Sequence, residues 1–227
     1  MHRKENTLNS LHNRVVLITG AGRGVGAQLA EAFAAAGARV AANDITPINL
    51  DETVARVRAA GGQIRDYVAD IAKKMPVQAL VNQVLDDWGR LDVLVNCSGV
   101  DPQKALLDLD EWDWRRALDV NLTGPFLLMQ SVGRVMRESG GGVILNVLAP
   151  DGGASLQTSM AALATLTVAA AREFSAYNIR VHALALRPLG LPGEQRSPYL
   201  DLPQTALALC NPEETAKAES SILFTIL

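Results

Sequence analysis

Four glycines fall within the eight residues Thr19 to Gly26, which read Thr-Gly-Ala-Gly-Arg-Gly-Val-Gly. An apolar, β-rich run, Val15 to Thr19, leads into this stretch, and a helical pattern, Ala27 to Ala36, follows it directly. Glycine permits a tight turn with positive φ and a close approach of backbone to ligand, and free N–H groups at a helix N-terminus attract phosphate. The placement predicts a dinucleotide pyrophosphate site rather than a merely structural turn. The expected contacts are Gly20, Arg23, Gly24, Val25 and Gly26.

An acidic residue, Asp44, ends the next β-rich run, about 20 residues beyond the glycine turn. A carboxylate at this point accepts hydrogen bonds from ribose hydroxyls and repels a 2′-phosphate, which favours NAD over NADP. Arg23 argues for NADP, because a guanidinium at the turn can bind that phosphate. The alternative for Asp44 is a solvated acid at a strand end. We expect NAD as the cofactor.

The elements that must position these residues alternate along the chain. Each β-rich run is followed by a helix-length stretch, and this alternation predicts a mostly parallel sheet with helices on both faces. Right-handed crossovers then give an α/β fold, a single doubly wound Rossmann-type domain over residues 13–227, with a flexible N-terminal tail, 1–12. The predicted strands are Val15 to Thr19, Arg39 to Asn43, Ile64 to Val68, Val93 to Val95, Val143 to Val147 and Ile179 to Leu184.

Two further segments stand out by composition. The predicted helix from Leu156 to Ala176 is rich in Ala and Thr, which suits either a subunit interface or a buried internal helix. The segment Leu189 to Gln204 is rich in Pro, Gly and polar residues and is expected to be a loop above the carboxyl edge of the sheet.

The bulk composition narrows the classes of partner. The 227 residues carry a net charge of −3 without a block of either sign, which favours neither nucleic acid nor a membrane surface. Cys97 and Cys210 lie far apart and lack metal-ligand spacing, so we expect no metal site, no disulfide framework and a cytoplasmic protein. Cys97 is expected to be a small buried hydrophobic residue rather than a nucleophile.

The chain resembles the short-chain dehydrogenase/reductase family over about residues 12 to 220. The turn from Thr19 to Gly26 matches the family's TGxxxGxG, the sequence Asn-Cys-Ser-Gly from Asn96 to Gly99 stands at its NNAG, and Tyr177 to Val181 resembles the segment entering the sixth strand. The resemblance implies that Asp70 and Ile71 lie at the adenine and that Asn96 and Gly99 contact the cofactor.

The same resemblance makes Asn121 the family's active-site asparagine. Three of the residues that the resemblance assigns also have a structural alternative. Asp70 can cap a helix, Asn96 can tie backbone segments together, and Asn121 can belong to a helix kink.

The family's catalytic set is missing from the sequence. Its YxxxK pair aligns with Leu156 and Met160, and its serine aligns with Ala149, or with Leu148. No tyrosine of the chain is followed four residues later by lysine, and no lysine occurs between Lys104 and Lys217. Loss of a positioned general acid or base costs about 10² to 10⁴ in rate, whereas loss of one hydrogen bond to the ribose costs about ten- to hundredfold in affinity. Binding can therefore survive without chemistry.

Three hypotheses follow. In the first, the chain is an oxidoreductase-like protein that binds NAD(H) and is impaired in carbonyl and alcohol hydride transfer. In the second, it is a non-catalytic pseudoenzyme that acts as an interaction partner. In the third, it is an enzyme of altered chemistry that uses Asp151 as proton carrier. The simpler interpretation of Asp151, beside Pro150, is a turn residue. Arg187 could hold a substrate carboxylate or serve as a surface residue. The resemblance implies a homo-oligomer, a dimer or tetramer, and an unknown small-molecule substrate. It also leaves open whether the family's last strand is lacking.

Overall fold

The computed structural model describes residues 11–149, 151–186, 194–196, 202–211 and 223–225. Its elements in chain order are β1 (Val15–Thr19), α1 (Gly24–Ala35), β2 (Arg39–Asp44), α2 (Pro47–Ala59), β3 (Gln63–Val68), α3 (Lys74–Trp88), β4 (Val93–Asn96), α4 (Glu111–Leu118), η1 (Asp119–Thr123), α5 (Gly124–Ser139), β5 (Gly142–Leu148), α6 (Ala154–Phe174), η2 (Ser175–Tyr177), β6 (Ile179–Ala185), β7 (Glu194–Arg196), α7 (Leu202–Cys210) and β8 (Leu223–Thr225).

The strands form one sheet in the order β3-β2-β1-β4-β5-β6-β8-β7, and every recorded pair is parallel. The doubly wound α/β fold is confirmed, and all six predicted strands are present with ends within one residue. The strand order reverses at β1, which pairs with β2 on one side and β4 on the other. Ligands of open parallel sheets bind at such a switch point, beyond the carboxyl ends of the strands.

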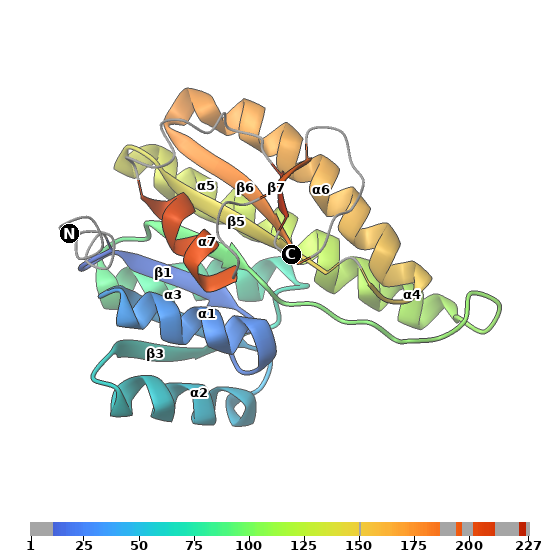
Figure 1. The fold of residues 1–227 in the computed structure, drawn as a ribbon, viewed down its shortest axis with the longest axis horizontal. Coiled ribbons are helices and arrows are strands. Elements are labelled where there is room, and N and C mark those ends of the chain that lie inside the picture. The colour runs from blue at the N-terminus through green and yellow to red at the C-terminus, as the bar shows by residue number, and fades with distance from the viewer. Residues whose placement is uncertain (1–10, 150, 187–193, 197–201, 212–222, 226–227) are drawn as a thin grey trace.

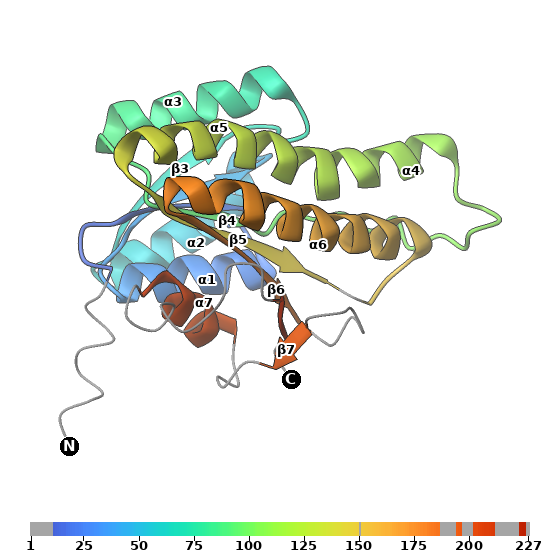
Figure 2. The same ribbon diagram turned by 90° about the horizontal axis from the view of Figure 1, so that it is seen from above.

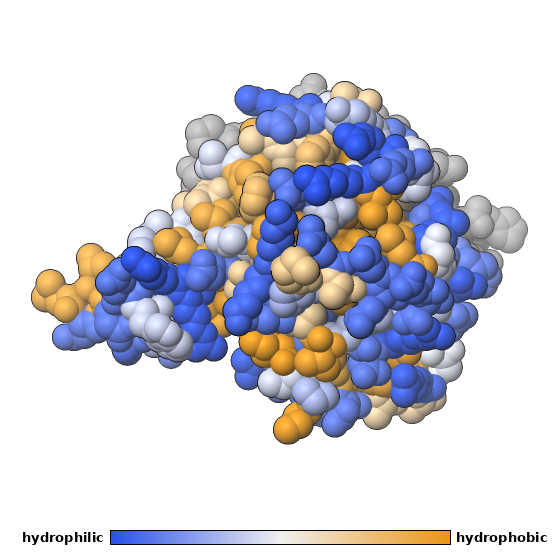
Figure 3. Space-filling view, turned by 180° about the vertical axis from the view of Figure 1, so that it is seen from behind, coloured by the Kyte–Doolittle hydropathy of each residue, from blue (hydrophilic) through white to orange (hydrophobic). Residues whose placement is uncertain are grey.

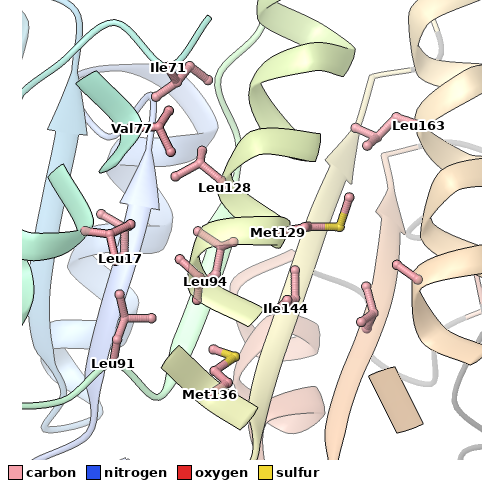
Figure 4. Packing of buried hydrophobic residues seen from close by; sticks show 14 of the residues in the cluster. Leu17, Ile71, Val77, Leu91, Leu94, Leu128, Met129, Met136, Ile144 and Leu163 are labelled. Atoms are coloured by element: carbon pink, nitrogen blue, oxygen red, sulfur yellow. The ribbon is translucent and has the colours of Figure 1, made fainter. Parts of the chain in front are cut away.

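Helices cover both faces of the sheet (Figures 1 and 2). One face packs against α1, α2 and α7, with Phe33 and Ile18 among its fully buried side chains. The other packs against α3, α5 and α6, where Leu94, Leu128 and Ile144 interdigitate (Figure 4). The strands β1 and β4 have no exposed residue, because both of their faces carry helices.

Two details differ from the sequence-based expectation. The edge beyond β6 does not lack a strand, because β8 pairs with β6 in parallel and β7 pairs with β8. The predicted loop from Leu189 to Gln204 is wrong at Glu194–Arg196, which is a strand, and from Leu202, where α7 begins. Leu202 and Ala206 are buried against the α1 side of the sheet, and this apolar face stabilises a helix that the adjacent prolines concealed.

Only the end of the predicted tail is described. Residues 1–10 lie outside the described part, and Leu11 is buried in the core with 2% of its surface exposed.

The Ala-rich helix α6 buries one face in the core and exposes the other. Leu163, Thr167 and Ala171 face the core, while Ala161 and Ala169 are exposed. Within the described residues, the stretch Ala154–Tyr177 is long and apolar enough to cross a membrane by length and composition, but half of its most apolar window is buried, as in a core helix.

The loop before α4 projects from the body of the molecule (Figure 1). Leu106 and Leu107 in this loop are 69% and 99% exposed. The space-filling view from behind shows an apolar tip on the same projection (Figure 3).

Candidate functional site

The glycine turn has the geometry of an anion cradle. Gly20 and Gly24 adopt φ of +64° and +56°, which strain any residue with a Cβ. A Cβ on Gly26 would overlap the carbonyl oxygen of Gly20, so the close crossing of turn and helix requires glycine. No side chain caps the N-terminus of α1, and its first turn holds no acidic residue. The positive end of α1 is thus left for a ligand anion, and these residues fit a pyrophosphate.

The turn is fastened to the end of β4. Thr19 Oγ1 accepts hydrogen bonds from the backbone N–H of Cys97 (3.1 Å) and of Ser98 (3.2 Å). A Cβ on Gly20 would lie 2.9 Å from Ser98 Cα, so the two segments touch through their backbones. Burial raises the pKa of the Cys97 thiol to about 12, which keeps it neutral; its side chain packs against the core but is only partly buried and lines the pocket at the switch point.

Asp44 is a buried anchor of the turn, with 8% of its surface exposed. Its Oδ2 accepts from Gly22 N–H (3.3 Å), and its Oδ1 accepts from Ile45 N–H (2.8 Å) and Asn49 Nδ2 (2.9 Å). The alternative of a solvated strand-end acid is therefore wrong. A carboxylate has about four acceptor positions, so Oδ2 retains room for one more donor, such as a ribose hydroxyl.

Asn49 was missed by sequence reasoning. It lies in the first turn of α2, and a Cβ on Gly22 would meet Asn49 Cβ at 2.5 Å and its carbonyl oxygen at 2.7 Å. Asn49 therefore fixes both Asp44 and the turn. The signal in the sequence that could have indicated this role is the position of Asn49, an amide residue three positions after Thr46, the N-cap of α2.

One pocket of about 640 Å³ at the switch point collects most of the predicted cofactor residues. Such a volume is typical of ligand sites. The predicted residues that line it are Gly20, Arg23, Val25, Gly26, Asp44, Asp70, Ile71 and Gly99. Gly24 and Asn96 do not line it. Trp112, Arg115 and Arg116 of α4 do line it; these were not predicted, because only the tertiary fold brings α4 over the pocket.

Asp70 shapes the far end of this pocket. Its Oδ1 accepts from Ala72 N–H (3.0 Å), and its Oδ2 lies 3.3 Å from Lys73 Nζ. The N-cap of α3 is Lys73 and has no side-chain cap, so Asp70 holds the preceding turn and does not cap the helix. Ile71 packs against Gly124, where a Cβ would lie 2.9 Å from Ile71 Cδ1.

Both predicted asparagines are buried and bonded within the protein. Asn96 Nδ2 donates to Asn146 Oδ1 (2.7 Å), while Asn96 Oδ1 has no hydrogen-bond partner in the described part of the chain. Asn121, in the π-helical turn η1, accepts from Val100 N–H (2.8 Å) and donates to Val100 O (2.9 Å) and to Ser159 Oγ (3.0 Å). Asn121 thereby ties the segment after β4 to α6.

The three positions aligned with the catalytic set do not line the pocket. Leu156 and Met160 are 6% and 4% exposed, and Ala149 packs against the core. Met160 Cε lies 3.9 Å from the position of a Cβ on Gly99, so its methyl group faces the end of the pocket. The neighbouring hydroxyl, Ser159 Oγ, is fully buried and donates to Leu156 O (2.9 Å).

Asp151 is an exposed residue of the turn before α6 and is not among the residues that line the pocket. The adjoining Gly153 N–H donates to Asp101 Oδ2 (3.1 Å), so this turn is fastened to the segment after β4. Arg187 lies outside the described residues. Within the described ranges, no three His, Cys, Asp or Glu residues are placed to hold a metal ion.

Comparison with known proteins decides the family. The model of the family described as short chain dehydrogenase matches residues 14–191. The chain belongs to the short-chain dehydrogenase/reductase family. Members of this family bind a nicotinamide dinucleotide and a substrate, and they often form oligomers.

Individual relatives agree with the family model. The short-chain reductase protein NovJ of Streptomyces niveus is 38% identical over 192 residues, covering 82% of this chain and 71% of NovJ. BbsD of Thauera aromatica, a hydroxy(phenyl)methylsuccinyl-CoA dehydrogenase subunit, is 37% identical over 196 residues, covering 84% of this chain and 77% of BbsD. The crystal structure of a hydroxysteroid dehydrogenase from Escherichia coli matches with a TM-score of 0.84 at 31% identity and covers 98% of each chain.

Proposed function

We propose that this short-chain dehydrogenase/reductase binds NAD(H) and is impaired or inactive in ordinary hydride transfer between alcohols and carbonyls. The observation that carries the proposal is the pair of buried apolar side chains, Leu156 and Met160, beside an intact pyrophosphate turn. A bound nicotinamide supplies or accepts a hydride, and the reaction also needs a group that moves a proton. Neither a leucine nor a methionine side chain moves protons at neutral pH.

Two polar side chains near the aligned positions, Ser159 and Asp151, are poor replacements for the missing phenol. The Ser159 hydroxyl is fully buried and hydrogen-bonded to Asn121 and to the backbone of α6. Asp151 lies on the exposed turn before α6, away from the pocket lining. These placements favour impaired hydride transfer over altered chemistry that uses Asp151.

The choice of NAD over NADP rests on Asp44. This carboxylate lines the pocket, is held by three hydrogen bonds, and has one acceptor position left on Oδ2. A fixed negative charge favours ribose hydroxyls and repels a 2′-phosphate. Arg23 is exposed at the rim of the same pocket, where a guanidinium favours the 2′-phosphate of NADP. Titration with NADH and with NADPH tests which of the two residues decides the preference.

Calorimetric titration with NADH and NADPH tests binding, and a panel of ketones and alcohols tests turnover. We expect NADH to bind more tightly than NADPH, with turnover at least about 10²-fold below that of an active relative. Absence of NADH binding at millimolar concentration contradicts the proposal, and so does turnover typical of the family. If turnover occurs and disappears in Asp151→Asn, the altered-chemistry hypothesis is supported instead.

A second candidate function is that of a non-catalytic subunit. A shallow apolar hollow of about 490 Å³ lies between α5 and α6, and the outward Phe126 beside it is 43% exposed. A second hollow, of about 250 Å³, shares Phe126, Leu166 and Ala169 with the first. The relative from Thauera aromatica is itself named as a dehydrogenase subunit. These features support pairing across this face, in a homo-oligomer or with a catalytically complete relative.

Light scattering at micromolar concentration tests the association. We expect at least a dimer, which Leu166→Glu converts to a monomer because it places a charge in both hollows. The matched control is Ala161→Glu, on an exposed position of α6 that lines neither hollow. A monomeric wild-type chain contradicts self-association, and co-expression with a complete family member then tests the mixed subunit pair.

A further inference from the structure

The pocket at the switch point is built for one half of a dinucleotide. Its described lining comes from the glycine turn, the ends of β2 and β3, the segment after β4, α4 and η1. No described residue of β5 or α6 lines it. Donors and charges for an adenosine and a pyrophosphate are therefore present, and the lining ends at Gly99 and Val100 on the side of α6.

Beyond this end, the two residues of α6 that align with the family's tyrosine and lysine are apolar. Met160 presents its Cε methyl group 3.9 Å from the position of a Cβ on Gly99, and Leu156 lies one turn earlier on the same helix with 6% exposed. Ser159 Oγ, the hydroxyl next to Met160 in the sequence, is used inside the protein by Asn121 and by a backbone carbonyl. The part of α6 that would have to receive a ribose, at Leu156 and Met160, therefore presents methyl groups.

The turn before α6 closes over the same apolar residues. A Cβ on Gly152 would overlap Leu156 Cδ2 and lie 2.6 Å from Asp101 Oδ2, so the backbone of this turn rests directly on both side chains. Gly153 N–H donates to Asp101 Oδ2 at 3.1 Å, and Gln157 Nε2 donates to Gly152 O at 2.7 Å. Two hydrogen bonds thus hold the turn in the position that covers Leu156.

We propose that the site recognises the ADP moiety alone, so that ADP, ADP-ribose and NADH bind with nearly equal affinity. This inference rests on the proposed function, because it assigns the ligand class of the same pocket. A charged hydrogen bond to the second ribose would strengthen NADH binding by about ten- to hundredfold over ADP. With Met160 in place of a cation, no described residue supplies that bond.

The test is calorimetric titration of the full chain with ADP, ADP-ribose, NADH and nicotinamide mononucleotide under one buffer condition. We expect the dissociation constants of the first three ligands to agree within fivefold. We expect nicotinamide mononucleotide neither to bind at millimolar concentration nor to displace ADP-ribose. The fluorescence emission of bound NADH should keep the maximum of free NADH, because the nicotinamide stays in water.

The outcomes separate the two proposals. NADH binding more than fivefold tighter than ADP, or binding of nicotinamide mononucleotide, overturns the ADP assignment and leaves the proposed NAD(H) binding intact. If no adenine nucleotide binds at millimolar concentration, the proposed function itself fails and this assignment fails with it. Agreement within fivefold, with an unshifted emission maximum, supports the assignment.

Discussion

Removal of the Asp44 carboxylate is expected to damage both the fold of the glycine turn and ligand binding. The substitution Asp44→Ala removes the acceptor of Gly22 N–H, Ile45 N–H and Asn49 Nδ2 at once. Because Asp44 is only 8% exposed, water reaches these donors incompletely after the substitution. The donors are then left partly unsatisfied, which costs more than an exposed hydrogen bond would.

The magnitude follows from the three bonds. A hydrogen bond to a charged group contributes about 1.5–3 kcal/mol, and bonds that share one acceptor are not additive. The bond from Gly22 is long, at 3.3 Å, and contributes the least. We therefore expect Asp44→Ala to lower the free energy of unfolding by about 2–4 kcal/mol. Asp44→Asn keeps an oxygen for Ile45 and Asn49 and should cost about half as much.

Urea unfolding of the ligand-free chain at pH 7 measures this change, and calorimetry measures NADH affinity. The control is Asp108→Ala, because Asp108 is exposed and its side chain has no recorded hydrogen bond or ion pair in the described part. We expect NADH to bind at least about tenfold more weakly to Asp44→Ala than to wild type. If Asp44→Ala is no less stable than Asp108→Ala, the anchoring role argued for Asp44 is refuted.

Three other pairs of substitutions, each a variant and its control, have defined expectations. Gly26→Ala places a Cβ onto a carbonyl oxygen of its own turn and should abolish NADH binding in calorimetry, whereas Gly24→Ala meets open space and should cost only about 1–2 kcal/mol in urea unfolding through its positive φ. Burial and the nearby guanidinium lower the pKa of His182 to about 4 from an ordinary 6.5. Between pH 6.5 and 4 the unfolded chain therefore binds a proton that the folded chain does not bind. The free energy of unfolding should fall by about 3 kcal/mol as the pH drops from 6.5 to 4. His182→Asn should remove this pH dependence in unfolding titrations, and His12→Asn, on the exposed surface, should keep it. Met160→Lys should tighten NADH binding at least about tenfold relative to Met160→Leu.

Each of these expectations has a contrary outcome. Equal NADH affinity in the two glycine variants would mean that the crossing at Gly26 does not shape the ligand site. An unchanged acid dependence in His182→Asn would place the responsible group elsewhere. If Met160→Lys binds NADH no better than Met160→Leu, either the alignment of residue 160 or its assigned contact is incorrect.

Much of the fold could be predicted from the sequence because its signals are local. The central β-rich runs are buried on both faces and therefore read as continuous apolar stretches, so strands such as β1 were placed to the residue. The glycine turn was equally clear, since positive φ at Gly20 and Gly24 is a property of the local backbone. The absence of a tyrosine–lysine pair was also settled by residue spacing alone.

The tertiary structure decided how those residues are used. Asp44 was expected at a strand end, but its burial and its partner Asn49 follow from the packing of α2 onto the turn. Asn96 was expected to contact the cofactor or to tie neighbouring segments together, and its bond to Asn146 across neighbouring strands is fixed by sheet register. Helix α7 was hidden because its stability comes from burial of Leu202 against α1 and not from local propensity.

The sequence by itself thus determined that a nucleotide turn survives where a phenol and an ammonium group are missing. Only the fold showed what surrounds the residues aligned with those two groups, because contacts such as that of Met160 with Gly99, or of Asp101 with Gly153, join residues more than 50 positions apart. The amino-acid sequence shows which chemical groups the chain contains and how far apart they lie along it. It does not record which of them share a pocket, since that depends on how helices and strands pack.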